Sequence, residues 1–296
     1  MRKLCCVVVA LVCGFVGAFQ TPIHNQPASS RRGVMELAMS TSAVDGSATT
    51  IYSTLKKPTK VLTVGLEYAG GNKLSDVELS ILSMQLRKSK VSAIWSTDLE
   101  AVQKFASEQQ SAKGNFPGPC PVIYFGSVNE AEQALKFGAS AVVLSVADLV
   151  DDTLLSIPGE IIWKVKSASN VEATMAKTDG RANVFWIDCD ADDEMAATIA
   201  ALPSKALWIA AVNAMQPDGA EIAAGKEYKT RGCGSILVRN ACIGDSEDTE
   251  YAQFCVGGFT SKASSEFKFS GLTGSTNGHF GGIQANSSVK WRRMNV

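Results

Sequence analysis

The chain has 296 residues, a formal net charge of −1 and 46% hydrophobic residues. This length allows one large α/β domain or two small ones. Charged residues make up 19% of the chain and their signs almost balance, so the sequence offers no electrostatic field for nucleic acid. We therefore expect no nucleic-acid partner.

Residues 1–18 are typical of a secretory signal peptide. Two basic residues follow the initiator Met, and residues 4–18 form an apolar stretch that is too short to span a membrane. Small residues end this stretch, so cleavage is expected just before Phe19. No later segment is apolar over 18 residues, and we expect no transmembrane segment in the mature chain.

Residues 19–50 have the composition of a transit peptide. They are rich in Ser, Thr and Ala and contain Arg31 and Arg32 but only two acidic residues. The stretch 17–22, with Phe19 directly after the expected cleavage point, resembles the two-part leader of algae with secondary plastids. The resemblance implies a plastid (chloroplast) location, and secretion with a disordered pro-segment is the alternative.

Eight short apolar runs, each followed by a stretch of helical character, organise residues 57–243. They start near Val61, Val91, Cys120, Ser140, Glu160, Asn183, Ala206 and Gly234. Strands that are apolar on both sides suit a parallel sheet covered by helices. Starts about 20 to 30 residues apart suit right-handed βα units, which predicts a (β/α)8 TIM barrel. An open doubly wound sheet is the alternative, but the first turn, 65–70, does not fit GxGxxG.

Residues 244–296 form a predicted Gly/Ser-rich C-terminal extension. The acidic stretch 244–254 is expected to form a last helix, and residues 257–282, with seven Gly and many Ser and Thr, a mobile loop. Within that loop, Gly274–Gly282 could cradle an anion through backbone N–H groups, although no strand or Lys supports that interpretation.

Cysteine and histidine usage argues against a cofactor or metal site. Only one His follows the leader, and no CxxC pair exists. The cysteines that follow the signal peptide are scattered and odd in number, and we predict that most are small core residues: Cys120, Cys189, Cys233, Cys242 and Cys255.

Several stretches resemble indole-3-glycerol-phosphate synthase, a (β/α)8 carbon–carbon lyase of tryptophan biosynthesis. They are Val91–Asp98, which ends in Thr-Asp, Cys120–Leu149 with its Gly-Ala-Ser-Ala-Val-Val-Leu run, and Gly232–Val238. The similarity covers roughly residues 61–242. It implies an ancestral site for a phosphorylated small molecule at the carboxyl ends of the strands.

The residues that this lyase chemistry needs are largely replaced. At the end of strand 3 the family has a Lys as general acid, and this chain has Phe125, whose ring carries no proton to donate. Strand 5 reads Lys164-Val-Lys166 in place of Glu-Val-His, and Arg239 stands at the family's phosphate-binding Gly. Because catalytic groups that act together fail together, we predict a binding or assembly protein without the original lyase activity. The alternative is an active lyase, or another enzyme acting on a phosphorylated small molecule.

Polar residues nevertheless gather at the predicted carboxyl ends of the strands, where barrel active sites form. The candidate catalytic residues are Glu67, Lys164 and Asp188; the candidate ligand-binding residues are Lys166, Asp190, Asn213, Arg239 and Asn240. Three arrangements are open: satisfied ion pairs that close the barrel mouth, an anion pocket of Lys164, Lys166 and Arg239, or carboxylates holding Mg²⁺. The expected partner is a phosphorylated small molecule or a plastid protein, the latter contacted by the extension.

Overall fold

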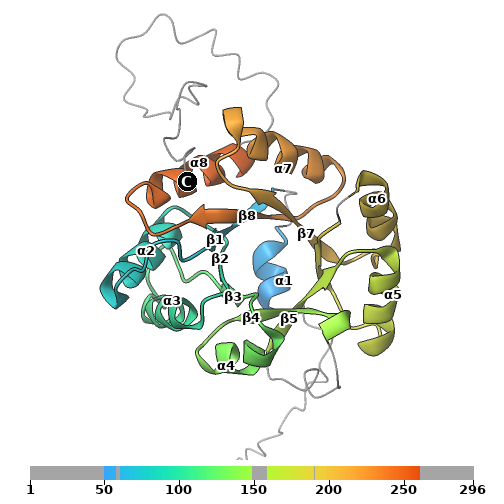
Figure 1. Cartoon of the computed structure of the whole chain (residues 1–296), viewed down its shortest axis with the longest axis horizontal. Coiled ribbons are helices and arrows are strands. Elements are labelled where there is room, and N and C mark those ends of the chain that lie inside the picture. The colour runs from blue at the N-terminus through green and yellow to red at the C-terminus, as the bar shows by residue number, and fades with distance from the viewer. Residues whose placement is uncertain (1–49, 58–60, 149–158, 190, 261–296) are drawn as a thin grey trace, which may run out of the picture. The chain divides into compact units, whose positions relative to one another are not determined.

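A computed structural model of the chain describes residues 50–57, 61–148, 159–189 and 191–260 (Figure 1). The predicted signal peptide, the transit segment up to residue 49, the extension beyond Thr260 and Asp190 lie outside the described residues.

Eight parallel strands pair in chain order, and the last pairs with the first, so the sheet closes into a barrel. The strands are β1 (Thr63–Tyr68), β2 (Ala93–Ser96), β3 (Val122–Tyr124), β4 (Ala141–Ser145), β5 (Glu160–Val165), β6 (Val184–Ile187), β7 (Leu207–Asn213) and β8 (Ser235–Cys242). The predicted TIM-barrel fold is confirmed.

Helices surround the strands, as Figure 1 shows. The α-helices are α1 (Thr50–Leu55), α2 (Asp76–Lys88), α3 (Leu99–Ser111), α4 (Ala131–Lys136), α5 (Ala168–Lys177), α6 (Asp192–Ala201), α7 (Ala220–Thr230) and α8 (Asp248–Thr260). Short 3-10 turns are η1 (Val128–Glu130), η2 (Val146–Asp148) and η4 (Pro217–Gly219). After β4 the described chain stops in η2, at the start of the gap 149–158.

Local sequence signals set where the helices begin and end. Ser75 and Glu78 form a capping box that starts α2, because each satisfies a backbone N–H group of the other. The Asp98 carboxylate accepts hydrogen bonds from backbone N–H groups at the start of α3. Gly138, with φ of 99°, follows α4 in the left-handed region that glycine adopts readily, and the chain turns there into β4.

The core has two parts, because alternate strand residues point to opposite faces of the sheet. Residues such as Leu66, Val142 and Phe185 pack outward against the helices. A second cluster, which includes Ile123, Ile209 and Trp186, fills the barrel interior. The interior is therefore packed with side chains and is not an open channel, as is usual for this fold.

Helix α1 closes the amino-terminal end of the barrel. Its Ile51 and Leu55 are 1% and 0% exposed and belong to the interior cluster. The Ile51 N–H donates to the Glu160 carboxylate at the start of β5 (2.6 Å), and the Tyr52 hydroxyl donates to the carbonyl of Lys205 just before β7 (2.6 Å). In Figure 1 this helix (blue) lies within the ring of strands.

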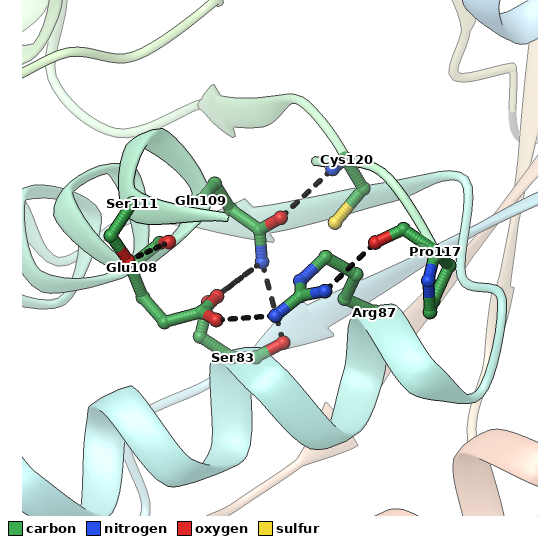
Figure 2. Close-up of polar contacts among 7 residues, drawn as sticks. All are labelled: Ser83, Arg87, Glu108, Gln109, Ser111, Pro117 and Cys120. Carbon is green, nitrogen blue, oxygen red and sulfur yellow. Dashed lines mark hydrogen bonds and ion pairs between the residues drawn. The ribbon is translucent and has the colours of Figure 1, made fainter. Parts of the chain in front are cut away.

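A buried polar network joins α2 to α3 on the outside of the barrel (Figure 2). Arg87 forms an ion pair with Glu108 (2.8 Å) and donates to the carbonyl of Pro117 (2.8 Å). Ser83 and Gln109 both donate to the other Glu108 carboxylate oxygen, at 2.9 and 2.8 Å. The carboxylate thus accepts hydrogen bonds from three side chains that are largely removed from water.

Candidate functional site

The carboxyl ends of β1 and β8 are joined through Glu67. Its buried carboxylate accepts hydrogen bonds from Arg239 Nε (2.7 Å) and from the backbone N–H of Asn240 (2.8 Å). The pairing of β1 with β8 shifts here, since Leu66 pairs with Val238 but Tyr68 pairs with Cys242. Asn240 has φ of 55°, a conformation that Asn tolerates better than most residues. Glu67 therefore holds a bulge in β8.

A second ion pair joins β5 to the segment after β6. Lys164 Nζ lies 2.8 Å from Asp188 Oδ2, and both side chains are about one third exposed (31% and 37%). The same ammonium lies 4.7 Å from the centroid of the Trp186 ring. Lys164 is thus held by a carboxylate and by the face of an aromatic ring.

Three aromatic rings lie beneath these charges. Trp95, Phe125 and Trp186 contact one another edge to face, with centroid distances of 5.9 to 6.0 Å. The guanidinium of Arg239 lies 5.5 Å from the Phe125 ring and 5.7 Å from the Trp186 ring. The position that the resemblance assigns to a general acid is therefore part of an aromatic floor.

The carboxyl ends of the strands form the mouth of the barrel, and this mouth contains a pocket of about 290 Å³. Its lining residues are Thr97, Phe125, Gly126, Val143, Leu144, Ser145, Lys164, Trp186 and Arg239. Among the described residues, the terminal nitrogens of Arg239 make no hydrogen bond, because only Nε contacts Glu67. The indole N–H of the buried Trp186 likewise has no acceptor there. The pocket therefore combines aromatic walls with terminal Arg239 nitrogens that make no hydrogen bond to any described residue.

The structure brings four of the predicted site residues together at the mouth of the barrel. Glu67, Lys164, Asp188 and Arg239 form the two ion pairs at the mouth. The remaining predictions differ: Lys166 and Asn213 are exposed and do not line the pocket, Asn240 contributes its backbone, and Asp190 lies outside the described residues. Two of the three cations proposed for an anion pocket, Lys164 and Arg239, do line it.

The loop between β8 and α8 is closed by its own carboxylate. Asp248 is 1% exposed and accepts hydrogen bonds from the backbone N–H groups of Ile243 (3.2 Å), Gly244 (2.8 Å) and Asp245 (3.2 Å). Successive N–H groups of this kind form an anion-binding nest. Burial nevertheless raises the pKa of the Asp248 carboxyl to about 6, although the N–H groups of Gly244 and Ile243 oppose the rise.

This raised pKa predicts a pH-dependent stability. Between about pH 4 and pH 6 the folded chain holds a proton on Asp248 that the unfolded chain has released, so this contribution to stability is lost as the pH rises. We therefore compare the urea midpoints of wild type and Asp248→Asn at pH 4.5 and at pH 7. The midpoint of wild type, relative to that of Asp248→Asn, is expected to be lower at pH 7 than at pH 4.5. The exposed Asp193→Asn is the control, and parallel profiles for wild type and Asp248→Asn would contradict the prediction.

The aromatic floor is the part of the site that the sequence interpretation missed. Trp95 pairs with Ile123 and Glu67, and Trp186 pairs with Lys164 and Ile209, so register places the rings at the level of the charges. The available signal was alternation, because Trp186 lies in β6 two residues before Asp188, and residues two apart along an extended chain point to the same side.

The described cysteines lie mainly in the core. Four of the five described cysteines are buried, which confirms the expected core role for most of them. Burial raises the pKa of the thiols of Cys120, Cys233 and Cys255 to about 12. No group of three or more potential metal ligands occurs in the described part. None of its helices is long and apolar enough to cross a membrane.

Comparison with known proteins identifies the fold and no closer relationship. No family model and no curated protein matches the chain. Tryptophan synthase subunit alpha from Legionella pneumophila str. Paris superimposes with a TM-score of 0.51 at 17% identity, over 71% of this chain and 96% of that one. Orotidine 5'-phosphate decarboxylase from Pyrococcus horikoshii OT3 gives 0.50 at 11%, over 68% and 100%. A native KDPGal structure gives 0.52 at 12%, over 67% and 94%. The chain is therefore a TIM barrel that shares its fold, at low identity, with these solved structures.

Proposed function

We propose that this chain is a plastid-directed barrel, diverged from an indole-3-glycerol-phosphate synthase-like ancestor, that has lost the lyase reaction and works as a binding protein. One observation carries the proposal. The ring of Phe125 fills the general-acid position and packs against Trp95 and Trp186. No proton can be delivered from that position, and loss of a general acid costs about 10²- to 10⁴-fold in rate.

The remaining charges are engaged with one another. The carboxylate of Glu67 already accepts from Arg239 and Asn240, and Lys164 is paired with Asp188. A group that holds a fixed internal partner must break that contact before it can orient a substrate or move its proton. Of the three arrangements considered for the barrel mouth, these contacts favour satisfied ion pairs, and they do not favour a site of proton transfer.

The usual phosphate site of such barrels is also altered. In this fold, phosphate commonly binds to the loops after strands 7 and 8 and to a nearby helix N-terminus. Here the loop after β8 already holds the Asp248 carboxylate on its N–H groups. Asp245, Glu247 and Glu250 add negative charge to the same stretch. This arrangement supports a barrel that no longer holds a phosphate ester there.

An enzyme acting on a phosphorylated small molecule is the second candidate function. Lys164 and Arg239 both line the mouth pocket, and two cations beside an open cavity favour an anionic ligand. Orotidine 5'-phosphate decarboxylase, which shares the fold of this chain, acts by its name on a phosphorylated molecule. For this candidate function, Lys164 or Arg239 must release its carboxylate partner when the substrate enters the pocket.

The plastid assignment rests on the leader. We expect residues 1–50, fused to a fluorescent protein and expressed in an alga with a secondary plastid, to deliver the fusion to the plastid. Replacing Phe19 with alanine serves as the matched control, since the aromatic residue follows the expected cleavage point. Secretion of the wild-type fusion would contradict the assignment.

Turnover tests the loss of the lyase reaction. The purified chain is incubated with 1-(o-carboxyphenylamino)-1-deoxyribulose 5-phosphate, and indole-3-glycerol phosphate is followed by its fluorescence. We expect no product above a protein-free blank, while an authentic synthase converts the same substrate. Measurable turnover by wild type that disappears in Lys164→Ala would overturn the proposal and establish an active enzyme.

A further inference from the structure

We propose that the mouth pocket binds a small, unphosphorylated carboxylic acid, held as its carboxylate by Arg239 over an apolar floor. The inference rests on the proposed function, since it names the ligand class of a binding barrel. The residues that carry it are Arg239, Trp186, Phe125 and Val143, all of which line the pocket.

Arg239 carries a fork of terminal donors that make no hydrogen bond to any described residue. Its Nε is bound to Glu67, and its plane is supported by the rings of Phe125 and Trp186. Among the described residues its terminal nitrogens bind nothing. A guanidinium held in this way matches the two oxygens of a carboxylate in a bidentate contact and loses little conformational freedom when it binds.

The charge at the mouth favours one negative charge on the ligand over two. Lys164 and Arg239 are each balanced by one carboxylate, from Asp188 and Glu67. The set of four is neutral, so a bound carboxylate adds one net negative charge to this partly desolvated cleft and a dianionic phosphate ester adds two, at a higher cost. The loop after β8 offers no relief, because Asp248 occupies its N–H groups.

The walls and the volume of the pocket define the rest of the ligand. Phe125 and Val143, which are half-buried, provide apolar surface for a hydrocarbon body, whereas Trp186 is only 1% exposed. A volume of about 290 Å³ lies at the lower end of the range for ligand pockets, so the molecule is small.

The test is a titration of the full chain with 4-methylpentanoate, an aliphatic carboxylate. Binding is followed by calorimetry and by the indole N–H resonances in a ¹⁵N spectrum, with Trp186→Phe assigning the peak. We expect a saturable shift of the Trp186 peak. The neutral 4-methylpentanamide and inorganic phosphate should bind at least about tenfold more weakly, as expected when a charge-assisted bidentate contact is lost.

Variants separate the pocket from general effects. Arg239→Gln should weaken carboxylate binding by about tenfold or more, and Arg239→Lys should restore only part of it. Arg231→Gln removes an arginine that pairs with Asp192 and Glu227 on the outer helices, and should leave binding unchanged. If Arg239 variants do not fold, Val143→Phe, which fills the pocket, replaces them and should abolish binding.

Equal binding of acid and amide, preference for inorganic phosphate, or a titration unaffected by Arg239→Gln and Val143→Phe would overturn the inference. Its failure is distinguishable from failure of the proposed function. A chain that neither turns over the lyase substrate nor binds 4-methylpentanoate overturns the ligand class alone. A chain that turns over the lyase substrate overturns the proposed function as well.

Discussion

Replacing Glu108 with alanine is expected to lower the free energy of unfolding by about 3–5 kcal/mol. The reason is the charge that remains. The side chain of Arg87 is 8% exposed and keeps only the carbonyl of Pro117 as a partner once the carboxylate is gone. Ser83 and Gln109 lose an acceptor at the same time, so a whole network between α2 and α3 is left short of partners.

Urea unfolding of wild type and Glu108→Ala, followed by circular dichroism, measures this loss. Glu132→Ala is the matched control, because the Glu132–Lys136 pair is exposed (62% and 71%) and pairs of that kind contribute only about 0.3–0.5 kcal/mol. Adding Arg87→Met to Glu108→Ala should recover part of the stability, since it removes the stranded charge. A loss no larger than that of Glu132→Ala would contradict the account of this network.

Leu55→Ala should be similarly damaging, with an expected loss of about 2–5 kcal/mol. Leu55 is fully buried and packs inside the barrel with Ile51, although it belongs to a helix of only six residues. Removing its branched side chain leaves a cavity at the amino-terminal end of the barrel. The closely packed strand residues around that cavity have little freedom to move in and fill it.

The control for Leu55→Ala is Val77→Ala, at a position that is 68% exposed, where a change within about 0.5 kcal/mol is expected. Thermal unfolding of both variants against wild type makes the comparison. Equal melting temperatures for wild type and Leu55→Ala would mean that α1 does not close the barrel in solution.

Much of the fold followed from pattern alone. The apolar runs expected to start near Ser140 and Asn183 are strands that begin at Ala141 and Val184, because a continuous apolar run between two helices suits a buried parallel strand. Helix α1 was missed, since two inward apolar residues in six are too few to show a period. The bulge at Arg239–Asn240 was also missed, because it depends on a partner, Glu67, that lies 172 residues away from Arg239.

The candidate site was predictable in part for the same reason. Charged residues at strand ends had to face the mouth, so Lys164 and Arg239 were expected there. Which residues pair was not predictable, because the contact of Lys164 with Asp188 depends on the register between β5 and β6. Lys166 is one residue beyond the end of β5 and is exposed, a difference that composition does not reveal.

The two ion pairs and the aromatic floor together define the mouth of the barrel. Phe125 and Trp186 provide a surface on which the cations rest, and Glu67 and Asp188 neutralise them. This arrangement keeps a pocket beside Lys164 and Arg239 and supports the proposed binding function.

The central claim is that the chain no longer binds the lyase substrate. Its most direct test is the melting temperature of the purified chain with and without a large excess of that substrate. Sulfate at equal ionic strength controls for general salt stabilisation. A ligand at 100 times its Kd stabilises a protein by about 2.7 kcal/mol, so specific binding would be plain. We predict no saturable shift. A saturable rise that disappears in Arg239→Ala would contradict the account and mean that the phosphorylated substrate still binds at the mouth.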